Sequence, residues 1–267
     1  MRGIVARLRR LWRGLAEAPV LVYAPEGWRT VLTDRQREGW NAAAVVAAEE
    51  RRWGAFVRNC RGSGPLGFSH EHDDLDVVRN VPFHNVHLSY AYVLALAAHG
   101  KSMVSVLDWG GGLGHYSLIG KAALPDVALE FHCLETPAMA AAGQRLNPSV
   151  QWHTDDACLE RMYDLVMING SLQYMEHWRD ALRRAARAAG RYLFLTRLPV
   201  VQSAPSFVAV QRIEGTELLH QQLNQRELLE EMEKTGLRLV REFVVGDRPY
   251  IGGAPEQCEM RGWLWTR

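Results

Sequence analysis

The chain has 267 residues, of which 48% are hydrophobic and 23% are charged, enough for one large globular protein with a sizeable core. Its 31 basic and 30 acidic side chains leave a net charge of +1 at pH 7, so no global field attracts nucleic acid and we expect no nucleic-acid partner. Four scattered cysteines without a C-x-x-C pair, and the lack of an apolar run near the roughly 18–20 residues of a membrane span, exclude a disulfide framework and favour a cytoplasmic protein.

Residues 1–15 predict a basic amphipathic helix. The apolar residues at helical spacing are Ile4, Val5, Leu8, Leu11, Trp12 and Leu15, and most of the other face carries Arg2, Arg7, Arg9, Arg10 and Arg13. The pattern favours a helix packed on its own domain. The alternatives are a frayed tail or contact with an anionic membrane surface, which would make the protein peripheral at the inner face of the membrane.

The chain that follows is predicted to be helical up to a loop. After a turn-rich stretch with Pro25 and Gly27, a helical pattern runs from about residue 34 to 57. The sequence RGSGPLG at residues 61–67 has the composition of a flexible loop and ends this pattern. We therefore expect an N-terminal helical extension over residues 1–80 and a second domain over residues 81–267.

The sequence HEHDD at residues 70–74 offers two imidazoles and two carboxylates close together in the chain. The ligands of a metal site must converge in space, and a short polar run is far more often a solvated loop. We predict such a loop here and no metal site. A further helix is predicted at residues 81–98.

From Met103 onward, segments typical of strands and of helices alternate. The predicted strands are residues 103–108, 129–135, 150–154, 163–169 and 191–197, and the predicted helices are residues 113–124, 137–146 and 178–190, the last closed by Gly190. Short apolar runs bounded by Gly, Pro or Asp are typical of strands buried on both faces. The pattern predicts an α/β fold, with a doubly wound parallel sheet between two layers of helices.

Several glycines follow the first of these strands, in the sequence VLDWGGGLGHYS at residues 106–117. In a doubly wound sheet, the first strand-to-helix turn usually contacts the ligand. A dinucleotide fingerprint starting at Gly110 would need its last glycine where His115 stands, and no Lys-Ser or Lys-Thr follows to make a P-loop. The remaining pattern is D-x-G-x-G-x-G, which starts at Asp108. Its glycines are Gly110, Gly111, Gly112 and Gly114.

This pattern resembles the first motif of class I S-adenosylmethionine-dependent methyltransferases. The resemblance implies a Rossmann-like fold and the cofactor S-adenosylmethionine, released as S-adenosylhomocysteine. It also implies that the glycines let the backbone approach the amino acid part of the cofactor and that Asp108 helps to hold its ammonium group. Glu135 ends the next strand, where dinucleotide-binding and methyltransferase folds alike use an acid to bind the ribose hydroxyls.

Two later segments extend the resemblance. The sequence DDA at residues 155–157 is similar to the step that contacts adenine, with Asp156 or Asp155 as its partner. The sequence MINGSLQYMEH is similar to the segment beside the reactive methyl, and it contains Asn169 and Gly170. The resemblance thus implies a cofactor site built at the ends of four strands.

A narrower resemblance covers roughly residues 80–267. The sequences LDWGGGLG, DLVMINGSLQYMEHW, RYLFLTRLP and the C-terminal MRGWLWTR follow the order seen in a bacterial family of methyltransferases often encoded with surface-polysaccharide genes. The resemblance implies O-methylation of a sugar hydroxyl in a glycan, glycolipid or nucleotide-sugar precursor. The alternatives are another small-molecule hydroxyl or carboxylate, a non-catalytic methyltransferase-like binding subunit, and an NAD(P)-dependent reductase. Nothing in the sequence indicates an oligomeric state.

Methyl transfer to a hydroxyl is helped by a general base, and a carboxylate acceptor needs none. The leading candidates are His220, which stands just before a predicted amphipathic helix in the region where related enzymes form the acceptor pocket, and His115, which opens the helix after the glycines. Other residues that could act as a base or line the pocket are His84, His87, His177, Tyr90, Tyr174 and Arg197.

Overall fold

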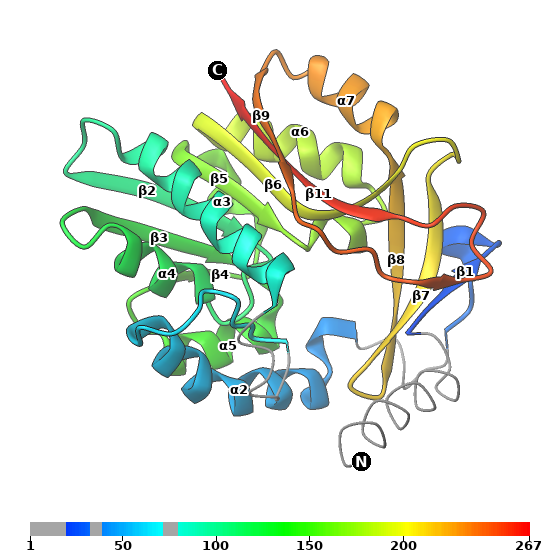
Figure 1. Cartoon of the computed structure of the whole chain (residues 1–267), viewed down its shortest axis with the longest axis horizontal. Coiled ribbons are helices and arrows are strands. Elements are labelled where there is room, and N and C mark those ends of the chain that lie inside the picture. Colours follow the sequence, from blue (N-terminus) through cyan, green and yellow to red (C-terminus); the bar gives the residue numbers. More distant parts are fainter. Residues whose placement is uncertain (1–19, 33–38, 72–79) are drawn as a thin grey trace, which may run out of the picture.

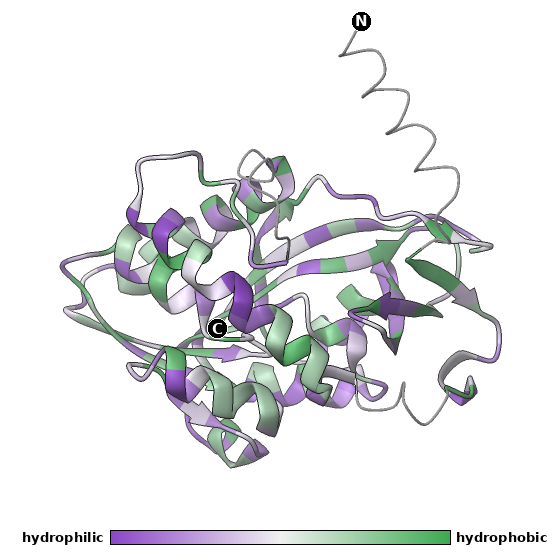
Figure 2. Cartoon of the chain, turned by 90° about the horizontal axis from the view of Figure 1, so that it is seen from below, coloured by the Kyte–Doolittle hydropathy of each residue, from purple (hydrophilic) through white to green (hydrophobic). Residues whose placement is uncertain are grey.

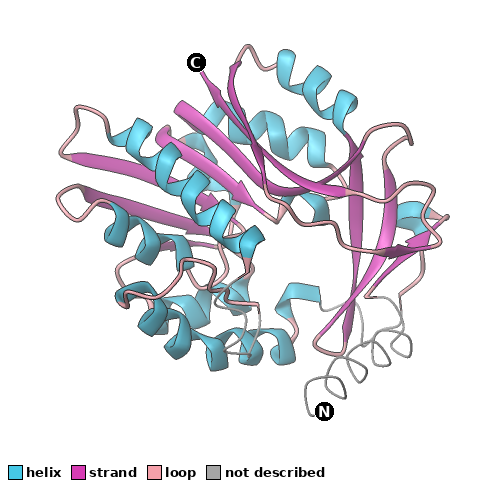
Figure 3. Ribbon diagram, in the orientation of Figure 1, coloured by secondary structure: helices cyan, strands magenta, loops and turns pink. Residues whose placement is uncertain are grey.

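A computed structural model describes residues 20–32, 39–71 and 80–267 of the chain. Its centre is a twisted sheet of five parallel strands, with a sixth and seventh strand added at one edge (Figures 1 and 3). The parallel strands, in spatial order, are β6 (Ala189–Val201), β5 (Tyr163–Asn169), β2 (Met103–Trp109), β3 (Ala128–Leu134) and β4 (Gln151–His153). The order reverses at β2, as the doubly wound prediction requires.

The edge beyond β6 is antiparallel, which the sequence did not predict. Strand β11 (Glu259–Thr266) pairs antiparallel with β6, and β9 (Arg238–Val244) pairs antiparallel with β11. The C-terminal strand therefore inserts between two strands that precede it in the chain. The predicted parallel sheet is confirmed for five strands, and its far edge is mixed.

Helices cover both faces of this sheet because its strands are apolar on both sides. Val106 and Leu165 pack into one core with helices α3 (Val81–Ala98) and α4 (His115–Ala123). Leu107 and Val166, the next residues along each strand, pack into the other core with α6 (Trp178–Ala188) and α7 (Gln225–Glu233). Figure 2 shows the helices carrying both apolar and polar stretches. The predicted helix at residues 137–146 is α5 (Pro137–Leu146).

A second, smaller sheet stands beside the first. Its strands, in order, are β10 (Ile251–Gly252), β1 (Leu21–Ala24), β7 (Phe207–Ile213) and β8 (Thr216–Asn224). Strand β6 continues past the main sheet and pairs with the end of β8, which joins the two sheets (Figure 1). His220 therefore lies within a strand, and α7 begins only at Gln225, directly after β8.

The part of the chain before residue 81 adds a strand to the second sheet and a helix beside the helices of the first. Strand β1 pairs with β7, while α2 (Ala43–Arg61) packs through Val45 and Trp53 against Leu113 and Met139, near α4 and α5. The helix predicted at about residues 34–57 begins at Ala43 and runs on to Arg61, so the predicted loop starts only at Gly62. Residues 33–38 and the predicted amphipathic helix at residues 1–15 lie outside the described residues.

Short turns and 3₁₀ helices complete the connections. The 3₁₀ helices are η1 (Gly27–Arg29), η3 (Gly39–Asn41), η5 (Asp156–Glu160) and η6 (Leu172–Tyr174). Helix α6 ends at Ala188 and β6 begins at Ala189, one residue before the predicted stop at Gly190. In the described ranges, every helix is too short or too polar to cross a bilayer.

Candidate functional site

The glycine loop, residues 110–114, connects β2 to α4 at the carboxyl end of the central strand. Gly110, Gly112 and Gly114 have φ values of +79°, +59° and +75°, a region that side chains other than glycine rarely adopt. A Cβ on Gly110 would lie 2.4 Å from Cβ of Ser171, whose hydroxyl donates to the Trp109 carbonyl at 2.5 Å. The loop is therefore pressed against the segment that follows β5.

Asp108 lies directly below this loop, where nothing in the described part of the chain neutralises its charge or satisfies its hydrogen-bonding capacity. Its side chain is fully buried, and neither carboxylate oxygen has a hydrogen-bond partner among the described residues. Burial, with the nearby Glu135, raises the pKa of Asp108 to about 8. An unpaired buried carboxylate is costly to keep, so this one is suited to a ligand that brings a cation or hydrogen-bond donors.

Glu135 follows β3, the parallel strand next to β2, so its carboxylate lies at the same end of the strands as the glycine loop. Oε1 accepts a hydrogen bond from the Gly112 backbone N–H at 2.8 Å, and Oε2 accepts one from the Thr136 N–H at 2.7 Å. Burial raises the pKa of Glu135 to about 7, although these backbone donors lower it. A carboxylate has room for about four hydrogen bonds, so two positions remain for a ligand.

The other predicted cofactor residues follow β4 and β5. Asp155 is exposed, and its side chain accepts from the Ala157 N–H at 3.0 Å at the start of η5. Asp156 is also exposed and pairs with Arg184 of α6. Asn169 is buried at the end of β5, with Oδ1 lacking a partner within the described ranges, and Gly170 has φ +68°. All of these residues lie at or just beyond the carboxyl ends of the parallel strands.

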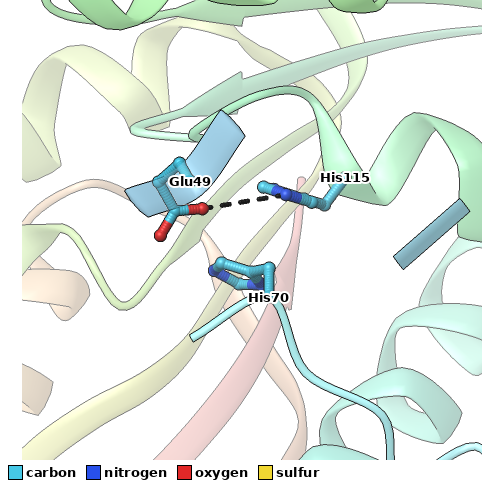
Figure 4. A group of neighbouring side chains, drawn as sticks. All are labelled: Glu49, His70 and His115. Atoms are coloured by element: carbon cyan, nitrogen blue, oxygen red, sulfur yellow. Dashed lines mark ion pairs between the residues drawn. The ribbon is translucent and has the colours of Figure 1, made fainter. Parts of the chain in front are cut away.

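His115 is the first residue of α4 and is almost completely buried. Its ring packs edge-on against Phe56, with centroids 4.6 Å apart, and stacks on His70 at 4.2 Å. Nε2 lies 3.8 Å from Oε2 of Glu49, which belongs to α2 (Figure 4). Burial holds the pKa of His115 well below its usual range, and burial with the neighbouring Glu71 raises the pKa of Glu49 to about 8.

His70 and Glu71 lie in a loop, as predicted for residues 70–74, but both are half-buried and packed against other side chains rather than fully solvated. His70 is stacked on His115, and Glu71 forms an ion pair with Arg197. Residues 72–74 lie outside the described residues. Sequence reasoning also missed Glu49, although it falls at helical spacing among the buried residues Val45 and Trp53 of α2, a position that marks a buried acid.

Arg197 links this region to the second sheet. It has a positive φ of 53°, an uncommon conformation for a residue with a side chain, and its guanidinium lies 4.9 Å from the centre of the Phe83 ring. Tyr174, in η6, donates to Gln211 at 2.6 Å and packs edge-on against His220, with ring centroids 5.2 Å apart. Both the Arg197 and Glu71 charges act on the pKa of Tyr174, so these groups lie in one neighbourhood.

His220 is buried in β8, and its Nδ1 lies 2.9 Å from the Gln222 side-chain nitrogen. Burial lowers its pKa to about 4. The structure thus places the two predicted bases on different elements: His115 lies beside the glycine loop, and His220 lies in the second sheet, in contact with Tyr174.

The remaining candidates lie on or beside helices α3 and α6. His87 of α3 is buried, and its Nδ1 donates to the Leu66 carbonyl at 2.7 Å. His84 is half-buried on the same helix, and His177 is exposed just before α6. Tyr90 is fully buried, and its hydroxyl has no hydrogen-bond partner in the described part of the chain.

No family model matches the chain, and a search of curated proteins gives no match. Solved structures do match. Magnesium protoporphyrin IX methyltransferase of Synechocystis PCC 6803, with S-adenosylmethionine bound, is 16% identical, covers 90% of this chain and 99% of its own, and has a TM-score of 0.52. A proposed sarcosine dimethylglycine methyltransferase from Galdieria sulphuraria is 11% identical over 82% of this chain and 97% of its own, with a TM-score of 0.51. The chain has the fold of the S-adenosylmethionine-dependent methyltransferases of class I.

Proposed function

We propose that the chain is an S-adenosylmethionine-dependent methyltransferase. The observation that carries the proposal is the buried Asp108 carboxylate, which lacks a partner in the described residues and lies under a glycine loop on a methyltransferase fold. An ammonium group would satisfy its charge and hydrogen-bonding capacity. NAD(P) has no such amino acid part, and a non-catalytic subunit would have no need to keep an unpaired carboxylate there.

The other cofactor contacts follow from the same edge of the sheet. Glu135 would accept from the ribose hydroxyls, because two of its hydrogen-bonding positions are free of the backbone donors described above. Asp155 or Asp156 would contact adenine beyond β4. Asn169 and Gly170 would lie beside the methyl group, since they follow β5, which neighbours β2.

Methyl transfer is an in-line displacement at the methyl carbon, with the sulfonium sulfur as the leaving group. Bound S-adenosylmethionine would supply the methyl group: the acceptor oxygen would attack the methyl carbon while the carbon–sulfur bond breaks, S-adenosylhomocysteine would leave, and the acceptor proton would pass to a base. The protein mainly has to orient the two reactants and exclude water. His115 and His220 are the proposed bases, and both imidazoles are neutral at pH 7 because burial lowers their pKa values.

We place the acceptor near Arg197, Glu71 and Tyr174. This neighbourhood combines a cation, a carboxylate and a hydroxyl that already hydrogen-bonds to Gln211. Such a mixture of donors and acceptors suits a hydroxyl-rich molecule, which supports a sugar hydroxyl of a glycan, glycolipid or nucleotide-sugar precursor as the acceptor.

The cytoplasmic location and the role of residues 1–15 rest on the sequence alone. If these residues bind an anionic membrane, replacing Arg7, Arg9, Arg10 and Arg13 by Gln should release the protein from anionic vesicles, as should high salt. If they pack on the domain, the same replacements should leave vesicle flotation unchanged.

Calorimetry and thermal denaturation with four adenosine-containing ligands test the proposed function. S-adenosylmethionine and S-adenosylhomocysteine should bind and raise the melting temperature, because a ligand of the native state stabilises it, while NAD and NADP should do neither. Stabilisation by NAD or NADP alone would overturn the proposal. Formation of S-adenosylhomocysteine with nucleotide sugars, lipid-linked sugars and simple carboxylates then identifies the acceptor.

A further inference from the structure

Three potential metal ligands converge beside the glycine loop. They are a carboxylate oxygen of Glu49 from α2, a ring nitrogen of His70 from the segment after α2, and a ring nitrogen of His115 from the start of α4. These three atoms all lie within 4.8 Å of one another. Figure 4 shows the side chains coming from three separate elements toward a common point. Such convergence from distant parts of the chain is what a metal site requires.

Two of the three atoms are buried and lack hydrogen-bond partners among the described residues. Oε2 of Glu49 and Nε2 of His115 have none, although the residues are only 7% and 1% exposed. Their separation of 3.8 Å is too long for a hydrogen bond between them. Because unsatisfied buried polar atoms are costly, this pair points to a ligand that accepts electron pairs from both.

The surroundings of His115 fit a metal ligand. Its other ring nitrogen faces the glycine loop, where a Cβ on Gly112 would lie 3.4 Å from Nδ1, and the imidazole hydrogen-bonds to the Gly111 backbone. A metal-binding histidine usually donates its second N–H to a carbonyl or carboxylate in this way, which fixes the tautomer and leaves the other nitrogen free for the metal.

We propose that Glu49, His70 and His115 form a binding site for a divalent transition metal of the Zn²⁺ type. Two imidazoles and one carboxylate are typical ligands of Zn²⁺ and of related first-row ions, whereas Mg²⁺ and Ca²⁺ prefer oxygen ligands. Ligands of a tetrahedral Zn²⁺ lie about 3.4 Å apart, given bonds of roughly 2.0–2.2 Å. The observed limit of 4.8 Å is near this spacing. Because the His70 and His115 rings are stacked with 20° between their planes, one ring must also turn so that both in-plane lone pairs face the ion.

The use of this metal rests on the proposed function. Three protein ligands leave a coordination position open, and an acceptor hydroxyl bound there would have a lowered pKa. Its proton would pass to solvent, the oxygen would attack the methyl carbon, and the carbon–sulfur bond would break. In that case His115 would act as a ligand of the metal and not as the base, and the metal would activate the acceptor hydroxyl in its place.

Cobalt titration of the chelator-treated full chain tests the site, with the Co²⁺ absorption spectrum as readout and Zn²⁺ as competitor. We expect one Co²⁺ per chain, a spectrum without a thiolate charge-transfer band, and displacement by Zn²⁺. Glu49→Gln, His70→Gln and His115→Gln should each weaken binding by more than the ~10–100-fold loss typical of an outer-shell partner. His153→Gln is the matched control, because it removes an imidazole from a different pair, with His132 at 2.8 Å.

Two results would overturn the metal site: no saturable binding, or variants that bind as the wild type does. His70→Gln decides the matter if the more buried His115→Gln fails to fold, since the His70 side chain is 17% exposed. Calorimetry with S-adenosylmethionine separates this question from the proposed function. Cobalt binding without cofactor binding would support the metal site and contradict the proposed methyltransferase function. Cofactor binding without cobalt binding would support the proposed function and contradict the metal site.

Discussion

The Asp108 carboxylate lies against the backbone of Gly111, so closely that a Cβ on this glycine would be 2.5 Å from Oδ2. The same Cβ would lie 2.8 Å from Sγ of Cys133, on the neighbouring strand. Gly111 is therefore required by close approach, whereas Gly110 and Gly112 are also required by positive φ. The loop and the carboxylate below it form one unit, and a change in either should affect ligand binding.

Gly111→Ala should weaken S-adenosylmethionine binding by more than tenfold. The added methyl cannot fit between two fully buried side chains, so the loop must shift, and overpacking of this kind costs about 1–3 kcal/mol of stability. Calorimetry gives the affinity, and thermal denaturation shows whether the variant is folded. Gly64→Ala is the control, because nothing lies within 4 Å of its Cβ position. A folded Gly111→Ala protein with normal affinity would remove this loop from the site.

Cofactor affinity should fall as the pH is lowered below about 8. The pKa of Asp108 is about 8 in the free protein, so at lower pH the carboxyl is protonated and must lose its proton to bind an ammonium group. The loss should reach at most tenfold per pH unit, and above about pH 8 the cofactor's own α-amino group loses its charge. Affinity should therefore peak near pH 8. Calorimetry at pH 6.5 in two buffers of different ionisation enthalpy should detect proton release on binding, and Asp108→Asn should release about one proton fewer than the wild type, since Glu135, with a pKa of about 7, can release its own.

Glu135→Ala should weaken both S-adenosylmethionine and S-adenosylhomocysteine by on the order of 1–3 kcal/mol, or about 5- to 150-fold, because both carry the ribose. The substitution also removes the acceptor of the Gly112 N–H, so the loop should become less ordered. Glu130→Ala is a matched control on the same strand, where the acid pairs with Arg161. Equal affinities of the two variants would contradict a ribose contact.

Much of this site could be predicted from the sequence because its signals are local. Short apolar runs marked the central strands, and a strand followed by closely spaced glycines marked the turn that contacts a ligand. Glu135 was found in the same way, from its position directly after a strand. Such patterns predict that these residues meet at the carboxyl ends of the parallel strands, and the fold confirms this arrangement.

The surroundings of the other residues could not be predicted, because tertiary packing determines them. His70 lies on a loop, whose polar composition says nothing about what it covers, and Arg197 is placed by a strand that continues out of the main sheet. His220 was expected just before a helix. It lies in β8, where a run of polar residues such as Gln222 is buried by contacts that no periodicity indicates.

His220→Gln should change how stability depends on pH. The pKa of His220 is about 4 in the folded protein and about 6.5 in the unfolded chain, so between these values the unfolded chain binds more protons. The wild type should therefore lose stability as the pH falls from 6.5 to 4, with His220 alone contributing about 3 kcal/mol. The variant should lose less over the same range, although at pH 7.5 it should be less stable by roughly 1 kcal/mol because the contact with Tyr174 is weakened.

Urea unfolding at several pH values measures both effects. His177→Gln, at an exposed position, should follow the wild type. If His220→Gln and the wild type lose stability in parallel, His220 is not the buried neutral imidazole described here.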